Sequence, residues 1–409
     1  MKKRTLALHW QIVIAIILGS LFGFFFTEQV HYVDWMGTIF MRALKMIAIP
    51  LVFCSVVAGV ASISAQDGFL RLGGKTLGYY FFTCLLAIIT GFVLVNLIKP
   101  GQGLSIPLPE DVTTIATSQT NIRDFLIGLI PDNIFQAFAN MNMVGIIIFA
   151  ILFGVFLGKS VHPGARKVQH AIEGMGDVIM NLTLLILKLA PVGIFGLIAK
   201  VIASDASSPQ LLRQMIESQG LYLFTVILGI AIHMFITLSI LLYVKGGINP
   251  FRHIAKMKDV ILMSFSTASS SGTLPLTMAH VKERLGVSEK LTNFTLPLGC
   301  TVNMNGTSLY ECVAVIFIAQ VYGMDLSIGQ QLFIIFGAFI VGLGAAGIPM
   351  ASLVLTVVII QMVGLPPESI GLILLVDRFA DMARTSLNVY ADTVCTVLVA
   401  KSEGETLKE

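Results

Sequence analysis

Long apolar stretches, each about as long as a bilayer is thick, fill most of this chain. A helix that crosses roughly 30 Å of hydrocarbon needs about 20 apolar residues. Six such stretches occur in the first part of the sequence, near residues 9–27, 38–62, 77–98, 135–158, 172–200 and 219–244. This pattern predicts six ordinary membrane-spanning helices.

Two later apolar stretches are interrupted in the middle. Val260–Val281 contains no Asp, Glu, Lys or Arg, is broken by SSSGTLP at Ser269–Pro275, and has basic residues beyond both ends. Because Lys and Arg concentrate on the cytoplasmic side, we expect a re-entrant hairpin that enters and leaves from the cytoplasm. Ser327–Pro366 would be about twice as long as a membrane is thick if it were one helix, and AAGIP at Ala345–Pro349 divides it. Its neighbouring loops lack Lys and Arg, which predicts a second hairpin that enters from outside.

Full spans follow the two hairpins, near residues 291–321 and 368–400. Interrupted apolar segments at corresponding positions, each followed by a full span, indicate an inverted repeat of the kind found in secondary transporters. Basic residues at the N-terminus and at Lys401 place both ends of the chain in the cytoplasm. The predicted fold is therefore an all-α integral membrane protein with eight transmembrane helices and two re-entrant helical hairpins.

Composition agrees with a membrane protein and excludes other classes. Hydrophobic residues make up 56% of the chain and charged residues only 12%, and the mean hydropathy is +0.88. The net charge of +3 is too small to support nucleic-acid binding as the main activity. The five cysteines are predicted to be free, packed thiols because they lie in apolar stretches without a CxxC pair: Cys54, Cys84, Cys300, Cys312 and Cys395.

Charged and polar residues inside the last span form a stripe. At about 100° per residue, six of them lie within one narrow arc of the helix: Asp377, Asp381, Arg384, Thr385, Asn388 and Asp392. Arg378 falls outside this arc. Because lipid penalises such charges, the stripe is expected to face an aqueous or liganded interior, and the planar fork of Arg384 suits a carboxylate. The alternative is a buried structural salt bridge, but two cations cannot neutralise three carboxylates there.

Two shorter motifs also carry polar groups. NMNGT at Asn303–Thr307 places two amides and a hydroxyl around a glycine, where a helix could unwind and offer carbonyl groups to a hard cation. The serines of the first interruption could instead be nucleophiles of an intramembrane hydrolase. That alternative requires a base, and only His280 is near them in sequence.

Four of these motifs occur together in one known order. SSSGTLP, NMNGT, AAGIP and DRFADMARTSLNVYAD resemble the dicarboxylate/amino acid:cation symporter family, which includes archaeal aspartate transporters and mammalian excitatory amino acid transporters. The six earlier spans fit the scaffold of that family, so the resemblance covers essentially the whole chain. It implies a homotrimeric, elevator-type secondary transporter of the cell membrane, and not an enzyme. The predicted units are scaffold spans in 1–76, a third span and external loop in 77–134, spans four to six in 135–250 and a transport core in 251–409.

The resemblance also implies a substrate site. Arg384 corresponds to the arginine that binds the side-chain carboxylate of the substrate, and Asp381 to the aspartate that binds its amino group. The remaining implied contacts are Ser269, Ser270, Ser271, Thr307, Ile348, Ser352, Thr385 and Asn388. The arginine favours aspartate or glutamate as the substrate. A C4-dicarboxylate or a neutral amino acid is the alternative within the fold, and a channel-like anion conductance is the alternative from another class.

The co-transported cations are expected at sites that match the family unevenly. The first sodium site is implied at Gly299, Asn303, Asn388 and Asp392, and the second at Thr301, Gly342, Leu343 and Ala345. The third site of the family keeps Tyr80 and Thr83, but Asn305 replaces its aspartate and Cys84 replaces a hydroxyl residue. Without its only carboxylate and one hard oxygen donor, the third site is predicted to be lost.

Two further positions bear on coupling. Glu311, one helical turn after Thr307, resembles the glutamate that animal members protonate, so we treat it as the proton-carrier candidate, with a structural neutral acid as the alternative. Met382 stands where potassium-coupled members have arginine. Potassium counter-transport is therefore not expected.

Overall fold

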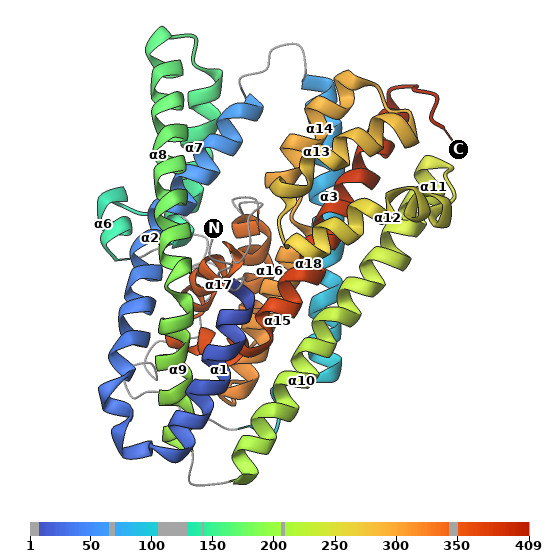
Figure 1. The fold of residues 1–409 in the computed structure, drawn as a ribbon. Coiled ribbons are helices and arrows are strands. Elements are labelled where there is room, and N and C mark those ends of the chain that lie inside the picture. The colour runs from blue at the N-terminus through green and yellow to red at the C-terminus, as the bar shows by residue number, and fades with distance from the viewer. Residues whose placement is uncertain are drawn as a thin grey trace, which may run out of the picture.

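A computed structural model describes residues 8–64, 70–104, 130–140, 143–205, 209–342 and 351–408, and these ranges contain helices and loops but no strand. This confirms the predicted all-α class. Figure 1 shows two groups of helices side by side. The outer group, whose members pack mainly on one another, consists of α1 (Leu8–Phe25), α2 (Asp34–Ser64), α7 (Met143–Lys159), α8 (Pro163–Lys188) and α9 (Ala190–Asp205).

The second group, here called the core group, surrounds the last helix. It joins α3 and α10 to the helices that follow residue 237. Its helices are α3 (Leu70–Ile98), α10 (Pro209–Ile232), α11 (Leu238–Gly246), α12 (Pro250–Thr267), α13 (Ser270–His280), α14 (Glu289–Val302), α15 (Asn305–Val321), α16 (Ile328–Gly342), α17 (Ala351–Met362) and α18 (Gly371–Ser402). α15 packs against both α3 and α18, so the polar last span lies within this group.

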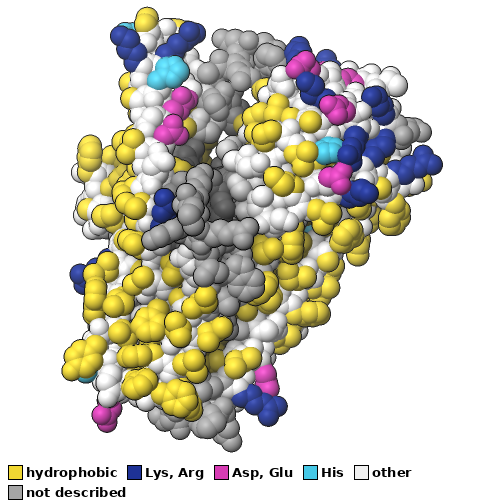
Figure 2. All heavy atoms as spheres, viewed as in Figure 1, with side chains coloured by type: hydrophobic (Ala, Val, Ile, Leu, Met, Phe, Trp, Pro, Cys, Tyr) yellow, Lys and Arg dark blue, Asp and Glu magenta, His cyan; other side chains and the backbone are white. Residues whose placement is uncertain are grey.

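The surface is apolar over a broad belt. Figure 2 shows hydrophobic side chains across the middle and lower parts of both groups, whereas Lys, Arg, Asp and Glu gather toward the ends. Among the described residues, three helical segments are long and apolar enough to cross a membrane: Arg71–Ile98, Arg213–Gly246 and Glu289–Val321. Exposed apolar side chains on such helices are expected for a protein whose solvent is lipid.

Two predicted spans are divided in the structure. The stretch predicted as 135–158 contains a short helix, α6 (Ile134–Ala139), and then α7 from Met143. The stretch predicted as 172–200 is α8 followed by α9, and the helices change at Leu189. Pro191 lies just after this point, and proline lacks the N–H that a continuing helix needs. α8 also begins nine residues earlier than predicted, at Pro163, because its first half is amphipathic and was missed by a search for apolar windows.

The interruptions predicted in the core group are present. The span 291–321 breaks between α14 and α15, where Asn303 and Met304 leave the helical region with φ/ψ of −96°/59° and −91°/55°. α12 ends at Ala268, which adopts a left-handed conformation with φ of 50°, and Ser269 then caps the next helix. α12 and α13 pack against each other and against α18, which makes them a helical hairpin. The tip of the second interruption, at residues 343–350, lies outside the described residues.

Candidate functional site

The polar stripe of α18 lies inside the core group, as predicted. All six of its side chains are buried, with at most 5% exposed: Asp377, Asp381, Arg384, Thr385, Asn388 and Asp392. α10, α12, α14 and α15 pack around this helix. The charges are therefore shielded from lipid and face protein groups.

Arg384 is held by two carboxylates and an aromatic ring. Its Nε and Nη2 donate to Oδ1 of Asp381 at 3.1 and 2.8 Å, and its Nη1 lies 3.5 Å from Oδ1 of Asp377. The guanidinium also stands 4.4 Å above the ring of Tyr310, within the range of a cation–π interaction. Nη1 has no hydrogen-bond partner among the described residues, so the fork retains donor capacity.

Tyr310 is a site residue that the sequence analysis missed. Its hydroxyl donates to Oδ1 of Asp377 at 2.6 Å, which fixes that carboxylate beside Arg384. Because Tyr310 follows Thr307 by three residues on α15, the two share one helix face. That spacing from a predicted site residue is the signal that could have found it.

Arg378, which the angular pattern placed outside the stripe, nevertheless joins its charges. Its Nη1 lies 3.4 Å from Oδ2 of Asp381, because a long side chain can reach sideways from a position just beyond the arc. Two arginines therefore face two carboxylates, Asp377 and Asp381. The third carboxylate, Asp392, is not part of this cluster.

The helix break beside α18 is closed by Asn388. Its Oδ1 accepts from the backbone N–H groups of Gly306 at 2.7 Å and Thr307 at 3.4 Å, which satisfies donors at the start of α15. Its Nδ2 donates to Oγ1 of Thr307 at 3.1 Å. A Cβ at Gly306 would collide with the backbone of Arg384, so glycine is required for this approach. Thr385, the neighbouring substrate candidate, donates its hydroxyl to the carbonyl of Asp381 at 2.8 Å.

The first predicted sodium site forms a corner around Asp392. Oδ1 of this carboxylate accepts from Nδ2 of Asn303 at 2.9 Å. Gly299 lies so close that a Cβ there would collide with Asp392 and with the hydroxyl of Tyr80. Asn388 stands one turn before Asp392 on the same face of α18. The structure thus brings the residues of this site together.

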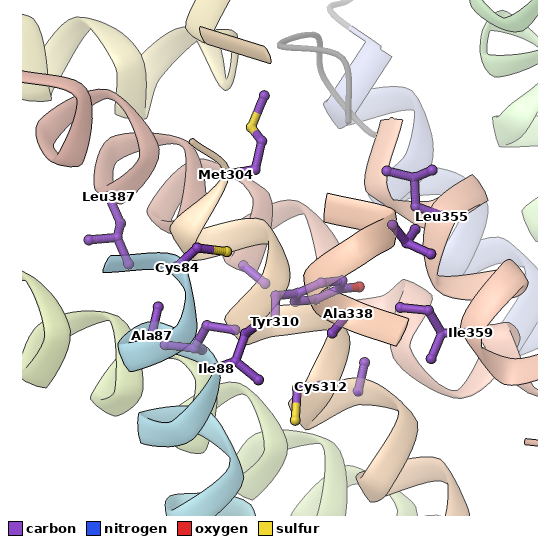
Figure 3. Close-up of a cluster of buried hydrophobic side chains, with 14 of the residues drawn as sticks. Cys84, Ala87, Ile88, Met304, Tyr310, Cys312, Ala338, Leu355, Ile359 and Leu387 are labelled. Atoms are coloured by element: carbon purple, nitrogen blue, oxygen red, sulfur yellow. The ribbon is translucent and has the colours of Figure 1, made fainter. Parts of the chain in front are cut away.

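The third predicted site is a neutral corner next to the first. Oγ1 of Thr83 lies 3.3 Å from Oδ1 of Asn303 and 3.5 Å from Oδ1 of Asn305. Sγ of Cys84 lies 3.4 Å from Oγ of Ser308, and Figure 3 shows the Cys84 side chain projecting from α3 toward α15. None of the side chains predicted for this site is a carboxylate.

Tyr80, the fourth residue predicted for the third site, bonds elsewhere. Its hydroxyl donates to the carbonyl of Thr295 at 2.7 Å. Nδ2 of Asn305 lies 3.5 Å from Nε2 of His233, a buried residue that starts a π-helical turn, His233–Thr237. His233 was not predicted as a site residue, because the sequence does not indicate that the turn after α10 packs against Asn305.

The second predicted sodium site is only partly described. Thr301 is exposed, and its hydroxyl donates to the carbonyl of Leu298 in its own helix at 3.0 Å. Gly342 instead packs against Ser308 on α15. Leu343, Ala345 and the predicted substrate contact Ile348 lie outside the described residues.

The serine side chains at the tip of the first hairpin form hydrogen bonds within the protein. Oγ of Ser269 accepts from the N–H of Gly272 at 3.0 Å and caps α13. Oγ of Ser271 lies 3.4 Å from Sγ of Cys300, and Ser270 is buried. His280 stands at the other end of α13, about 15 Å away along the helix axis, so it cannot be the base that the hydrolase alternative requires.

Two buried groups near the site carry little or no bonding within the described part of the chain. Both carboxyl oxygens of Glu311 lack a hydrogen-bond partner there, although its side chain is fully buried. An ionised carboxylate in such a place would be costly, so the surroundings favour a neutral acid. Oγ of Ser352, on α17, is also buried and without a partner there.

All five cysteines are free and buried, as predicted. The described residues contain no group of three or more His, Cys, Asp or Glu that could hold a metal ion. At Asp392 a carboxylate oxygen meets the amide N–H of Asn303, and a carboxylate is the hard oxygen ligand that a monovalent or divalent cation prefers.

Comparison with known proteins agrees with this geometry. A family model described as the sodium:dicarboxylate symporter family matches residues 8–402. The proton/sodium-glutamate symport protein of Bacillus caldotenax is 32% identical over 421 residues, which cover 99% of this chain and 97% of the relative. Excitatory amino acid transporter 3 of Mus musculus is 32% identical over 100% of this chain and 88% of its own length. The proton/glutamate-aspartate symporter of Escherichia coli (strain K12) is 31% identical over 98% and 94%. The chain belongs to the sodium:dicarboxylate symporter family.

Proposed function

We propose that this chain is a secondary active symporter that takes up acidic amino acids, aspartate or glutamate, together with Na⁺. The observation that carries the proposal is the buried pairing of Arg384 with Asp381 beside the helix break at Asn303–Met304. Relatives that are similar over nearly the whole chain are named as glutamate and glutamate-aspartate symporters. We propose no enzymatic reaction for this chain.

The chemistry of the substrate follows from the fixed charges. An acidic amino acid offers two carboxylates and one ammonium group, so it needs a fixed cation, a fixed anion and neutral donors. Arg384 supplies the cation with donor capacity at Nη1, and Asp381 supplies the anion. Thr385 and Asn388 of the stripe, together with Thr307 on α15, supply buried neutral groups. A C4-dicarboxylate lacks the ammonium group and would form no contact of its own with the carboxylate of Asp381, which favours the amino acid.

Cation coupling is assigned to two places. Sodium is placed at Asp392 and Asn303, where a buried carboxylate and an amide meet, and at a second site that includes Gly342. The neutral corner of Cys84 and Asn305 is assigned no sodium ion. Glu311 is assigned the proton, because it is a buried acid with no hydrogen bond in the described part of the chain and lies one turn from Thr307.

The proposed movement is of the elevator type. The core group would carry substrate across the membrane against the outer group, with eight transmembrane helices, two re-entrant hairpins, cytoplasmic termini and a homotrimeric assembly in the cell membrane. The packing of α3 and α10 on residues 251–409 supports a moving unit larger than that segment alone. The predicted unit boundary at residue 76 falls within α3, whereas those at residues 134 and 250 fall at the starts of α6 and α12.

Cysteine labelling tests the hairpins separately from transport. Cysteines introduced at Lys258 and Lys282 should react with a membrane-impermeant reagent from the cytoplasm, and cysteines at Ser327 and Pro366 from outside. The five native cysteines are buried, so they give little background. If the two ends of either segment react from opposite sides, that segment is a full span and the hairpin is wrong.

Uptake into proteoliposomes tests the function itself. Purified protein is given radiolabelled aspartate, glutamate or succinate under separately imposed Na⁺, H⁺ and K⁺ gradients. We expect concentrative uptake of the amino acids with an inward Na⁺ gradient and no stimulation by an outward K⁺ gradient. Passive equilibration under every gradient would favour the channel alternative, and stronger uptake of succinate would favour the dicarboxylate alternative.

A further inference from the structure

The chain continues past α18 as a short segment that crosses the end of the core group. We name residues 403–408 the C-terminal strap. Gly404 turns the backbone sharply away from α18 with φ of 85°, and the strap then runs toward the end of the first hairpin (Figure 1). Leu407 is buried in the main hydrophobic core with only 9% exposed, so the strap has an apolar contact and does not merely lie on the surface.

The strap bonds to the base of the first hairpin through backbone groups. The backbone N–H of Lys408 donates to the carbonyl of Leu285 at 2.9 Å, and its Nζ donates to the carbonyl of Glu283 at 2.9 Å. Both carbonyls lie at the end of a π-helical turn, Val281–Leu285, that extends α13. Helix ends leave such carbonyls without partners, and a lysine there is favourable.

Glu405 extends the same attachment to the next helix. Its Oε2 accepts from the backbone N–H of Ser288 at 3.0 Å, and Ser288 caps α14. Gly286, between these contacts, has φ of 77° and lies directly under the side chain of Lys408. The strap therefore covers the whole turn that joins the first hairpin to α14.

The other arm of the hairpin is tied to the same place. Nζ of Lys256 on α12 donates to the carbonyl of Lys408 at 2.9 Å. Arg284 donates to the carbonyl of Lys256 at 3.0 Å and pairs with Asp259 at 2.8 Å. A cavity of about 110 Å³ remains between α12, α18 and the strap, and Leu285, Val397 and Leu407 form its apolar wall.

The beginning of the strap is bonded to α3. Glu403 accepts from Nζ of Lys75 and lies 3.5 Å from Nη2 of Arg71. Nζ of Lys75 also donates to the carbonyl of Ser402, the last residue of α18, at 2.9 Å. Six residues thus connect α3, α18, both arms of the first hairpin and the start of α14.

We propose that Glu405, Leu407 and Lys408 are positioning residues for the substrate site. They fix the base of the first hairpin on α18, so that the serine tip at Ser269–Ser271 stays in register with the polar stripe while the core group moves. The tip is held far from its base by two helices, so a small rotation at the base moves the tip by a larger distance. This inference rests on the proposed function only in the assumption that the serine tip contacts the substrate.

The test combines a distance measurement with transport kinetics. Spin labels on Glu283→Cys and Ser402→Cys report the separation of the hairpin base from α18, and the buried native cysteines leave these exposed sites selective. The strap is weakened by Glu405→Gln with Leu407→Ala. Thr406→Ala is the matched control because Thr406 is exposed within the same segment, and Leu407→Met is the conservative variant.

We expect a broadened distance distribution in the double variant and a KM for substrate about three- to tenfold higher, with Vmax within about twofold, because lost preorganisation weakens binding. Thr406→Ala and Leu407→Met should resemble the parent. Unchanged distances would overturn the proposal, and so would a lowered Vmax at unchanged KM, which indicates a structural role only. Broadened distances with unchanged KM would also overturn it, since the tip would then be independent of the base. If the parent transports no acidic amino acid, the proposed function fails, while the distance measurement still decides whether the strap holds the hairpin.

Discussion

Two neighbouring corners of the buried polar interior differ in one respect, their charge. The corner around Asp392 holds a carboxylate that accepts from Asn303 at 2.9 Å. The corner beside it holds only neutral side chains, where Thr83 lies 3.5 Å from Asn305 and Cys84 contacts Ser308. Asn303 belongs to both corners, since its Oδ1 lies 3.3 Å from Thr83. The helices α3, α15 and α18 therefore hold two neighbouring candidate cation sites. One contains a carboxylate and the other contains only neutral side chains.

The balance of charge elsewhere shows why this difference matters. Arg378 and Arg384 face Asp377 and Asp381, so that cluster has no excess charge. Within the described part of the chain, the hydrogen-bond partner of Asp392 is a neutral amide, so Asp392 remains the unbalanced carboxylate of the stripe. A buried anion needs a cation or a proton, whereas the neutral corner needs neither. Sodium is expected where the charge is unbalanced.

The largest effect is expected from removal of the negative charge of Asp392. We expect Asp392→Asn to weaken Na⁺ activation of uptake by at least about tenfold, because a carboxylate is the strongest ligand available to a hard cation there. The measurement is the Na⁺ concentration that gives half-maximal uptake. Ser386→Ala is the control, since Ser386 also lies on α18 but donates to its own helix at the carbonyl of Met382. Unaltered Na⁺ activation in Asp392→Asn would mean that this corner holds no coupled sodium ion.

The balanced cluster should respond differently, through the substrate and not through sodium. Arg384→Cys removes a charge-assisted contact that contributes about 1.5–3 kcal/mol, so affinity for aspartate and glutamate should fall by about 10- to 150-fold. Neutral amino acids are then tested as replacement substrates. Arg378→Gln is the matched control, because Arg378 reaches Asp381 from the rim of the cluster, and its effect should be smaller. Equal substrate affinities in the parent and in Arg384→Cys would remove this residue from the site.

The converse experiment adds a carboxylate and a hydroxyl to the neutral corner and asks whether it then binds Na⁺. Asn305→Asp together with Cys84→Ser supplies the carboxylate and the hydroxyl that the family's third site uses. Each further coupled Na⁺ multiplies the attainable accumulation by about tenfold for a tenfold Na⁺ gradient. We therefore expect a reversal potential that corresponds to more Na⁺ per substrate in the double variant than in the parent. A parent that already couples three sodium ions would contradict the predicted loss of the third site.

Much of the fold could be predicted because its signals are local. Ser269–Pro275 and Asn303–Thr307 combine glycine with side chains that compete for backbone hydrogen bonds. The structure breaks its helices at the start of each motif, at Ala268–Ser269 and at Asn303–Met304, while the rest of the first motif lies within α13. The division of α8 from α9 at Leu189 was missed because both sides are apolar and a hydropathy window does not register one proline. The strap was missed as well, since its charged composition gives no indication of the carbonyls that it meets.

The site was predicted less completely, for a different reason. Helix periodicity orders the residues of α18, so the stripe was found from one helix alone. Tyr310 and His233 belong to other helices, and only packing brings them to Arg384 and Asn305. A sequence records spacing along one helix but not which faces of two helices meet.

Glu311 extends the comparison to protons, with a smaller effect. If the parent carries one proton with each substrate, accumulation should rise about tenfold for each unit of inward pH gradient. Glu311→Gln keeps the shape of a neutral acid but cannot release a proton, so this dependence should disappear while Na⁺-driven uptake remains. The measurement is steady-state accumulation at fixed Na⁺ and varied external pH. A normal pH response in the variant would show that another group carries the proton.

Glu403 in the strap is an exposed glutamate, in contrast to the buried Glu311. Its substitution should give the smallest of the predicted effects, a change in thermal stability. The hydrogen bond from Lys75 holds the pKa of Glu403 below its usual value, with the charge of Arg71 adding to the shift. A carboxyl whose pKa is lowered in the folded state stabilises that state above its ordinary pKa, and the contribution is lost as the pH falls through the lowered value. Glu403→Gln should therefore lower the thermal unfolding temperature slightly and by the same amount from about pH 8 to about pH 5, above the ordinary range of a glutamate. The difference from the parent should shrink only in stronger acid, and Thr406→Ala should show no difference at any pH. If instead the difference vanished between pH 7 and pH 6, Lys75 would not be the partner that lowers this pKa.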